Sequence, residues 1–316
     1  MSGPLRIGTR ASALALWQAR EVAARLAAQA GAPATELVHI RTSGDLQTEV
    51  PLWQTGGRAF FTREIDRALL DGAVDVAVHS LKDLPTELEA GITLGALLPR
   101  ADPRDALLSR SGAGLAALPA GARIGTSSLR RRAFLARLRP DAALLELRGN
   151  VPTRIERLQR GDYDAIVLAA AGVTRLGLAQ HVSEYLDSES FPPAVSQGVI
   201  AVCARSGDAA TRRWLGPLDD ADARLSVTAE RALLRHLEGG CQVPLGALAT
   251  VRDGRLSLMA AICALDGKRQ LSARAHAPAA AAEAEALGIR VAQELLGRGA
   301  ADLMQKEREA RAVEPP

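Results

Sequence analysis

The stretch Leu5-Arg6-Ile7-Gly8-Thr9-Arg10-Ala11-Ser12 reads as a short buried strand that runs into a polar turn. Residues 12–30 carry apolar side chains at helical spacing, so a helix should follow that turn. The stretch Arg123-Ile124-Gly125-Thr126-Ser127-Ser128 repeats this order of strand and hydroxyl-rich turn, and a second helix is expected over residues 128–139. The repetition predicts two α/β domains in series.

Other short apolar runs alternate with helical patterns through the first two-thirds of the chain. Strands are expected at residues 37–40, 74–78, 92–94, 144–147 and 165–169, and helices at residues 61–70 and 152–159. This alternation is typical of a largely parallel sheet covered by helices.

Two clusters rich in proline divide the chain, around residues 98–104 and again at residues 191–194. If the chain leaves the first domain, builds the second and returns, the two domains form a hinged cleft. The expected first domain is therefore residues 1–98 with 199–217, and the second is residues 99–198.

A third, small α+β domain is expected over residues 218–304. Its predicted helices span residues 227–237 and 279–296, and its strands span residues 247–251 and 256–264. Residues 305–316 are charged and end in prolines, so we expect a poorly ordered tail.

Composition excludes several classes of protein. Of the 316 residues, 47% are hydrophobic, but no apolar run is long enough to span a bilayer and the N-terminus has no secretion signal pattern. These two features predict a cytoplasmic protein without a membrane partner. An odd count of cysteines, Cys203, Cys241 and Cys263, fits a reducing compartment, and no spacing with histidine predicts a metal site. A net charge of +3 and only 3% aromatic residues argue against nucleic acid as a partner.

The arginines stand where ligands are usually bound in α/β sheets, at the ends of strands. Lysine occurs only three times, so almost all positive charge is on side chains that can grip a carboxylate with a two-point fork. Any one of these arginines could lie on a solvated helix face, but their number predicts a ligand with several acidic groups. The candidates are Arg10, Arg130, Arg131, Arg148, Arg154 and Arg175.

Two further residues could carry chemistry. The stretch Val78-His79-Ser80-Leu81-Lys82-Asp83 delivers Asp83 to the end of a buried strand, where a carboxylate could stabilise a developing cation; the alternative is a turn or cap residue. Cys241 lies in Glu238-Gly239-Gly240-Cys241-Gln242-Val243-Pro244, a tight turn that should present the sulfur; the alternative is a free cysteine in a loop.

These motifs together resemble the porphobilinogen deaminase (hydroxymethylbilane synthase) family, in the family's order and over nearly the whole chain. The resemblance rests on the Arg10, Asp83 and Cys241 stretches quoted above, on Gly125-Thr126-Ser127-Ser128-Leu129-Arg130-Arg131, and on Arg148-Gly149-Asn150-Val151. It implies a transferase of tetrapyrrole and heme biosynthesis that joins four porphobilinogen molecules head to tail and releases ammonia at each step. The implied fold has three domains, the first two similar to type-II periplasmic binding proteins, in a monomer.

The resemblance also implies roles for single residues. A dipyrromethane cofactor is attached to Cys241 by a thioether, and Asp83 assists departure of the amine. The acetate and propionate groups of the cofactor and substrate are held by the arginines. The implied cofactor-binding residues are Cys241, Ser80, Lys82, Asp83, Thr126, Ser128, Arg130, Arg131, Arg148 and Gly149. The implied substrate-binding residues are Arg10, Arg148, Arg154, Arg175, Gln197 and Phe61.

The chain departs from the family pattern in two loops. Ala59 stands where the lid stretch usually has glycine, which should stiffen it, and Ser196 replaces a glycine at the return crossing, where positive φ would be costly. The alternatives to this family are a noncatalytic protein that binds an organic anion and an enzyme that uses Cys241 as a nucleophile. The first leaves Asp83 and Cys241 without a role, and the second has only His236 nearby as a base.

Overall fold

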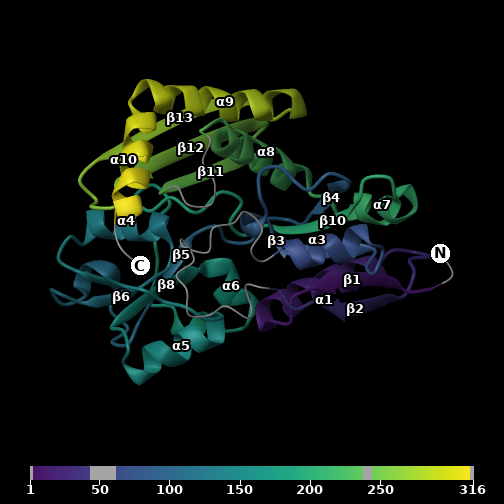
Figure 1. The fold of residues 1–316 in the computed structure, drawn as a ribbon, viewed down its shortest axis with the longest axis horizontal. Helices are drawn as coiled ribbons and strands as arrows, with labels where there is room; N and C mark the ends of the chain where they lie inside the picture. Colours follow the sequence, from purple (N-terminus) through teal and green to yellow (C-terminus); the bar gives the residue numbers. More distant parts are fainter. Residues whose placement is uncertain (1–2, 43–61, 238–243, 314–316) are drawn as a thin grey trace.

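The computed structural model describes residues 3–42, 62–237 and 244–313, which form three sheets with their helices (Figure 1). In that view the first sheet lies at the right, the second at the lower left and the third at the top. Each sheet has its own buried apolar core. Within the described residues, no helix combines the length and the apolar character that crossing a membrane requires.

The first sheet has the strand order β2-β1-β3-β10-β4. Its strands are β1 (Leu5–Thr9), β2 (Thr35–His39), β3 (Val76–Ser80), β4 (Ile92–Leu97) and β10 (Ile200–Arg205). Its helices are α1 (Ala13–Ala27), α3 (Arg63–Leu70) and α7 (Ala209–Leu215), with the short 3₁₀ turns η1 (Leu81–Asp83) and η4 (Gly216–Leu218). Val76 and Val78 pack with α1, whereas Ala77 between them packs with α3. Both faces of β3 are therefore covered, which explains its unbroken apolar sequence.

The second sheet repeats this plan with the order β7-β6-β8-β5-β9. Its strands are β5 (Asp105–Ser109), β6 (Arg123–Gly125), β7 (Ala143–Leu145), β8 (Ala165–Ala169) and β9 (Glu184–Tyr185). Its helices are α4 (Leu129–Leu138), α5 (Val151–Arg160) and α6 (Ala170–Arg175), with η2 (Leu115–Ala117) and η3 (Ala179–His181). Val167 packs against Phe134 of α4, and Ile166 packs on the other face with Ile155 of α5.

Both large sheets are largely parallel, as predicted, but each contains one strand that runs in the opposite direction. The pairs of β1 with β2 and β3 are parallel, but β10 runs antiparallel to β3 and β4. In the second sheet, β5 is antiparallel to β8 and β9. The reason is that β5 and β10 enter their sheets from the other half of the molecule, without the crossover helix that makes successive strands parallel. The chain thus crosses between the sheets twice.

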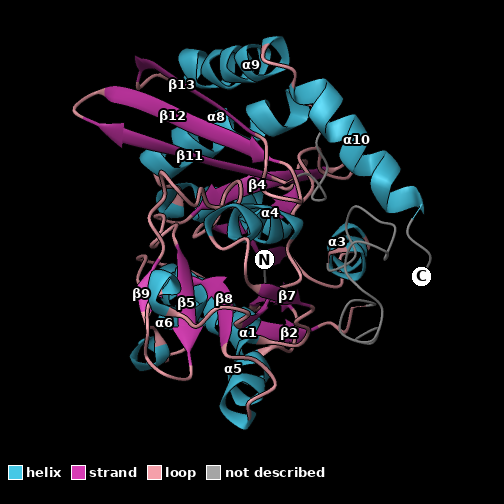
Figure 2. Cartoon of the chain, turned by 90° about the vertical axis from the view of Figure 1, so that its left-hand side faces the viewer, coloured by secondary structure: helices cyan, strands magenta, loops and turns pink. Residues whose placement is uncertain are grey.

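The third sheet is an antiparallel meander of β11 (Leu245–Arg252), β12 (Arg255–Cys263) and β13 (Gln270–Pro278). Its core is shared with α8 (Ala221–His236) and α9 (Ala281–Gly297), which confirms an α+β unit. Figure 2 shows α10 (Ala300–Val313) leaving the end of α9 at an angle.

The helix α10 differs from the poorly ordered tail that we expected from residue 305. Leu303 and Met304 are buried in the third core and hold the beginning of α10 in place. The residues that follow are mostly alanine, glutamate, arginine and lysine, which are strong helix formers. High charge is therefore not sufficient to predict disorder in this C-terminal segment.

One buried carboxylate joins both crossings to the third domain. Glu230 of α8 is fully buried and accepts hydrogen bonds from Arg100 at 2.7 and 2.8 Å. It also accepts from Ser196 N at 2.6 Å and Ala249 N at 2.7 Å. Ser196 has a φ of 64°, so the serine adopts the left-handed conformation expected of the glycine it replaces.

Candidate active site

The loop after β1 places the first group of predicted site residues. Ser12 Oγ accepts a backbone hydrogen bond at 3.3 Å and starts α1. Gln18, in the second turn of α1, donates from Nε2 to Ser80 Oγ at 2.8 Å and is buried. Burial, with the nearby charge of Arg10, lowers the pKa of His79 to about 4. The loop of Arg10 and the end of β3 are therefore neighbours.

The turn after β3 presents the candidate catalytic carboxylate. Leu81 is fully buried and anchors the turn, whereas Asp83 is exposed. Lys82 Nζ donates a hydrogen bond to Gln197 Oε1 at 3.2 Å. Burial lowers the pKa of Lys82 to about 8, although the Asp83 carboxylate opposes that shift. An accessible carboxylate thus lies beside a cation that is held by the second crossing.

Arg130 and Arg131, in the first turn of α4, are buried around one carboxylate that the sequence analysis did not identify, Asp105. Arg131 donates to Asp105 Oδ1 from Nε at 2.9 Å and Nη2 at 2.7 Å, and Arg130 Nη2 lies 2.8 Å from Oδ2. Their remaining bonds go to the backbone oxygens of Val167 and Pro192, at 2.8 and 2.6 Å. Two cations share one anion, so the group keeps a positive charge.

Asp105 also links this pair to the second crossing. Burial favours a raised pKa for Asp105, but the charges of Arg130, Arg131 and Lys82 overcome it and hold the pKa below the usual range. Gln197 donates from Nε2 to Asp105 Oδ1 at 3.2 Å and to Pro103 O at 2.9 Å. The available signal was a charged residue at the start of an apolar run, directly after the break predicted at residues 98–104, but no strand was predicted there.

Arg148 and Arg154 add two more cations next to the same group. The turn between them requires glycine, because Gly149 has a φ of 107°, and Asn150 Oδ1 then caps α5 by accepting from a backbone N–H at 3.0 Å. Burial, together with the charges of Arg131 and Arg148, lowers the pKa of Arg154 to about 10. Asp83 opposes this shift, so it lies close enough to act on Arg154. We call Lys82, Arg131, Arg148 and Arg154 the cationic cluster.

Arg175 takes a different position, across the two large sheets. Its Nη2 donates to Gly198 O at 2.7 Å, and its guanidinium lies over the ring of Trp17, 5.7 Å from the centroid. Burial lowers its pKa to about 10. Arg175 thus joins α6 to both α1 and the second crossing.

The predicted hydroxyl residues of the second sheet have structural partners. Ser128 Oγ caps α4 by accepting from Arg131 N at 3.4 Å, and Thr126 Oγ1 accepts from Ser128 N at 3.3 Å. These bonds shape the turn that presents the two buried arginines. The predicted residues Cys241 and Phe61, and the departure at Ala59, lie outside the described residues.

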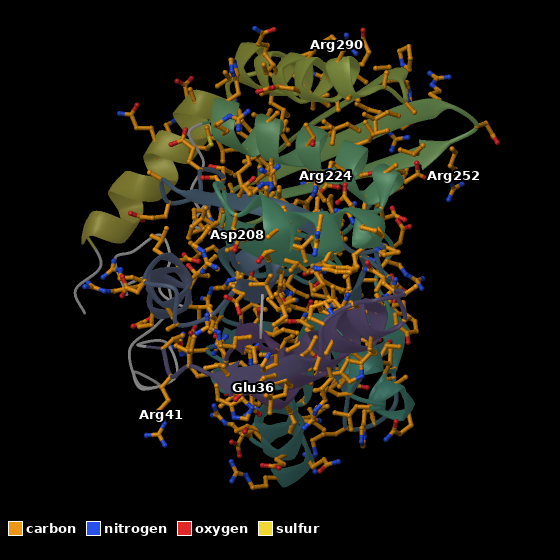
Figure 3. All side chains as sticks on the ribbon, turned by 90° about the vertical axis from the view of Figure 1, so that its right-hand side faces the viewer. Glu36, Arg41, Asp208, Arg224, Arg252 and Arg290 are labelled. Carbon is orange, nitrogen blue, oxygen red and sulfur yellow. The ribbon has the colours of Figure 1, made fainter. Side chains whose placement is uncertain are left out.

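Arginines elsewhere show the contrasting arrangement. Arg41 and Arg252 are exposed and extend outward from the ribbon (Figure 3). These side chains are exposed to solvent, whereas Arg130 and Arg131 are only 4% and 6% exposed.

Two family models match the chain. One, described as "Porphobilinogen deaminase, dipyromethane cofactor binding domain", matches residues 5–213, from β1 to α7. The second, described as "Porphobilinogen deaminase, C-terminal domain", matches residues 224–297, from α8 to the end of α9. The chain belongs to the porphobilinogen deaminase family.

Curated relatives agree with this assignment. The porphobilinogen deaminase of Syntrophotalea carbinolica is 48% identical over 299 residues, which cover 95% of this chain and 94% of that protein. The porphobilinogen deaminase of Roseiflexus castenholzii is 48% identical over 306 residues, which cover 96% and 99%. Among solved structures, the extracytoplasmic solute receptor DctP7 of Bordetella pertussis has a TM-score of 0.39 at 16% identity. The match covers 68% of this chain and 76% of that one.

Two cysteines of this porphobilinogen deaminase family member are poorly placed to form a covalent bond with a cofactor. Cys203 and Cys263 are fully buried. Burial, followed by the Asp66 charge, raises the pKa of the Cys203 thiol to about 12, which suppresses the reactive thiolate. In the described part of the chain, no cluster of three or more His, Cys, Asp or Glu side chains could hold a metal ion.

Proposed function

We propose that Asp83 is the catalytic carboxylate with which this member of the porphobilinogen deaminase family joins four porphobilinogen molecules into hydroxymethylbilane. The observation that supports this role is the position of Asp83: it is exposed and lies beside Lys82 and Arg154. The substrate carries an amine and two carboxylates. A site with one accessible carboxylate beside several cations complements both kinds of group.

The charges assign separate tasks within this proposal. The arginines bind and orient the substrate's acetate and propionate, which brings its aminomethyl carbon toward Asp83. Asp83 then stabilises the positive charge that develops on the pyrrole as ammonia leaves, because a fixed carboxylate near the reacting carbon needs little reorganisation. Substrate-binding roles are proposed for Arg10, Arg148, Arg154, Arg175, Gln197 and Phe61.

The described residues fit the dipyrromethane cofactor of this family. The cluster has a surplus of positive charge, and Arg154 Nε is buried without a hydrogen-bond partner in the described part of the chain, so a carboxylate could satisfy it. We propose that the cofactor is held covalently by Cys241. Noncovalent contacts are proposed from Ser80, Lys82, Asp83, Thr126, Ser128, Arg130, Arg131, Arg148 and Gly149. When bound, the cofactor supplies the primer from which the pyrrole chain grows.

The attachment is tested by the intact mass of the purified protein. The wild-type chain and Cys203→Ser are expected to carry the added mass of a dipyrromethane unit, and Cys241→Ser is expected to lack it. Cys203→Ser is the matched control, because it removes a thiol that burial already makes unreactive. An active wild-type protein of unmodified mass would overturn the attachment.

The remaining assignments concern assembly, location and domain bounds. We propose that the protein acts as a monomer in the cytoplasm. The proposed domains are residues 1–98 with 199–217, residues 99–198, and residues 218–304. The two chain crossings between the large sheets support these divisions. Sedimentation analysis at several protein concentrations tests the monomer.

A further inference from the structure

Glu146 is a carboxylate of the site that has no role in the function proposed above. It follows β7 directly, and its backbone oxygen accepts a hydrogen bond from Tyr163 Oη at 2.7 Å. Leu147 is fully buried in the second core, whereas Glu146 and Arg148 on either side of it are half-buried. The backbone therefore holds Glu146 close to an arginine of the cationic cluster.

The side chain of Glu146 is poorly satisfied where it lies. Its Oε1 is buried and has no hydrogen-bond partner in the described part of the chain. Glu230, by comparison, accepts four hydrogen bonds from Arg100, Ser196 and Ala249. A buried carboxylate oxygen without a donor is destabilising, so such an arrangement calls for an explanation.

The charge of Glu146 acts on the two arginines proposed to bind substrate. Burial lowers the pKa values of Arg148 and Arg154, and Glu146 opposes the shift in both. Arg154 Nε is also buried without a partner in the same part of the chain. Glu146 thus offsets part of the electrostatic penalty at Arg148 and Arg154, while Glu146 Oε1 and Arg154 Nε each lack a hydrogen-bond partner in the described part of the chain.

We propose that Glu146 is a specificity-determining residue, which competes with a carboxylate of the bound pyrrole for Arg148 and Arg154. The inference rests on the proposed function, because it concerns how that same site recognises an acidic pyrrole. A pyrrole carboxylate that binds these two arginines is repelled by the nearby carboxylate of Glu146. Glu146 therefore weakens the grip on each acidic unit and favours release of a product that carries many carboxylates.

The test compares Glu146→Gln, which keeps the shape and removes the charge, with Glu146→Asp, which keeps the charge. The probe is a pyrrole dicarboxylate without the aminomethyl group, titrated calorimetrically into the holoenzyme at low and high salt. Glu146→Gln is expected to bind the probe about three- to tenfold more tightly, with a steeper loss of affinity in salt, because one anion has gone. Glu146→Asp is expected to keep the wild-type dependence on salt.

Unchanged or weaker binding by Glu146→Gln, with a thermal midpoint equal to that of the wild type, would overturn the proposal. Should Glu146→Gln be unstable, Glu146→Ser gives the same comparison with a smaller neutral side chain. Turnover of porphobilinogen by the wild type is measured in parallel. If the wild-type protein converts porphobilinogen and carries the dipyrromethane adduct, the proposed function holds whatever affinity the Glu146 variants have for the probe.

Discussion

Lys82 Nζ donates a hydrogen bond to Gln197 Oε1 at 3.2 Å and so connects the turn that carries Asp83 with the second chain crossing. Gln197 in turn donates to Asp105, which holds Arg130 and Arg131. The Asp83 turn and the buried arginines, which belong to different sheets, are thereby positioned by one continuous set of polar contacts. Gln197 is the residue common to both.

The lowered pKa of Lys82 predicts a dependence of stability on pH. Its pKa is about 8 in the folded protein and near 10.5 when unfolded, so between these values the unfolded chain binds more protons. The Lys82 contribution to stability therefore rises as pH increases from about 8 to about 10.5. In a cofactor-free Cys241→Ser background, the free energy of unfolding should gain more over this range with Lys82 present than with Lys82→Met. Parallel curves for the two proteins would contradict this.

Asp83→Asn is expected to lose turnover without loss of folding. The carboxylate is exposed, so its removal should leave the thermal midpoint close to that of the wild type. Loss of the charge that stabilises a cation should lower kcat by about 100- to 1,000-fold. Steady-state kinetics and the intact mass, which should still show the adduct, check this. Comparable kcat values for Asp83→Asn and the wild type would refute the catalytic role.

Asp105→Asn is expected to damage both stability and substrate binding. The substitution leaves Arg130 and Arg131 buried without their shared anion, which should cost about 3–5 kcal/mol. The KM should rise as the arginines and Gln197 lose their positions. Chemical denaturation and kinetics measure the two effects. Asp71→Asn, which breaks an ion pair with Arg67 at the surface, is the control and should leave stability close to that of the wild type. Equal effects of the two substitutions would show that Asp105 does not organise the site.

Ser196→Gly is expected to stabilise the protein. Ser196 has a φ of 64°, and its buried Oγ has no hydrogen-bond partner in the described part of the chain. Glycine adopts this conformation freely, so the free energy of unfolding should rise by about 1 kcal/mol. Ser196→Ala keeps the Cβ and therefore the strain, and it should show no such gain. Thermal unfolding of the two variants and the wild type decides between strain and loss of the hydroxyl.

The sequence by itself determined the elements that local pattern controls. Apolar runs such as Val74-Asp75-Val76-Ala77-Val78 identified buried strands, helical spacing identified α1 and α4, and the strand-end loops with their motifs identified the family. These features depend on neighbours in the sequence, and the pattern of side chains reports them directly.

Tertiary structure alone decided which charges meet. Asp105 and Arg131 are 26 residues apart, and Lys82 and Gln197 are 115 residues apart, so no local pattern could pair them. The same holds for the antiparallel direction of β5 and β10, for the burial of Arg130, and for Glu146 Oε1, which has no hydrogen-bond partner among the described residues. An ion pair or a strand pair depends on the distance and solvent exposure that the folded chain creates, and those quantities exist only once the two crossings have brought the sheets together.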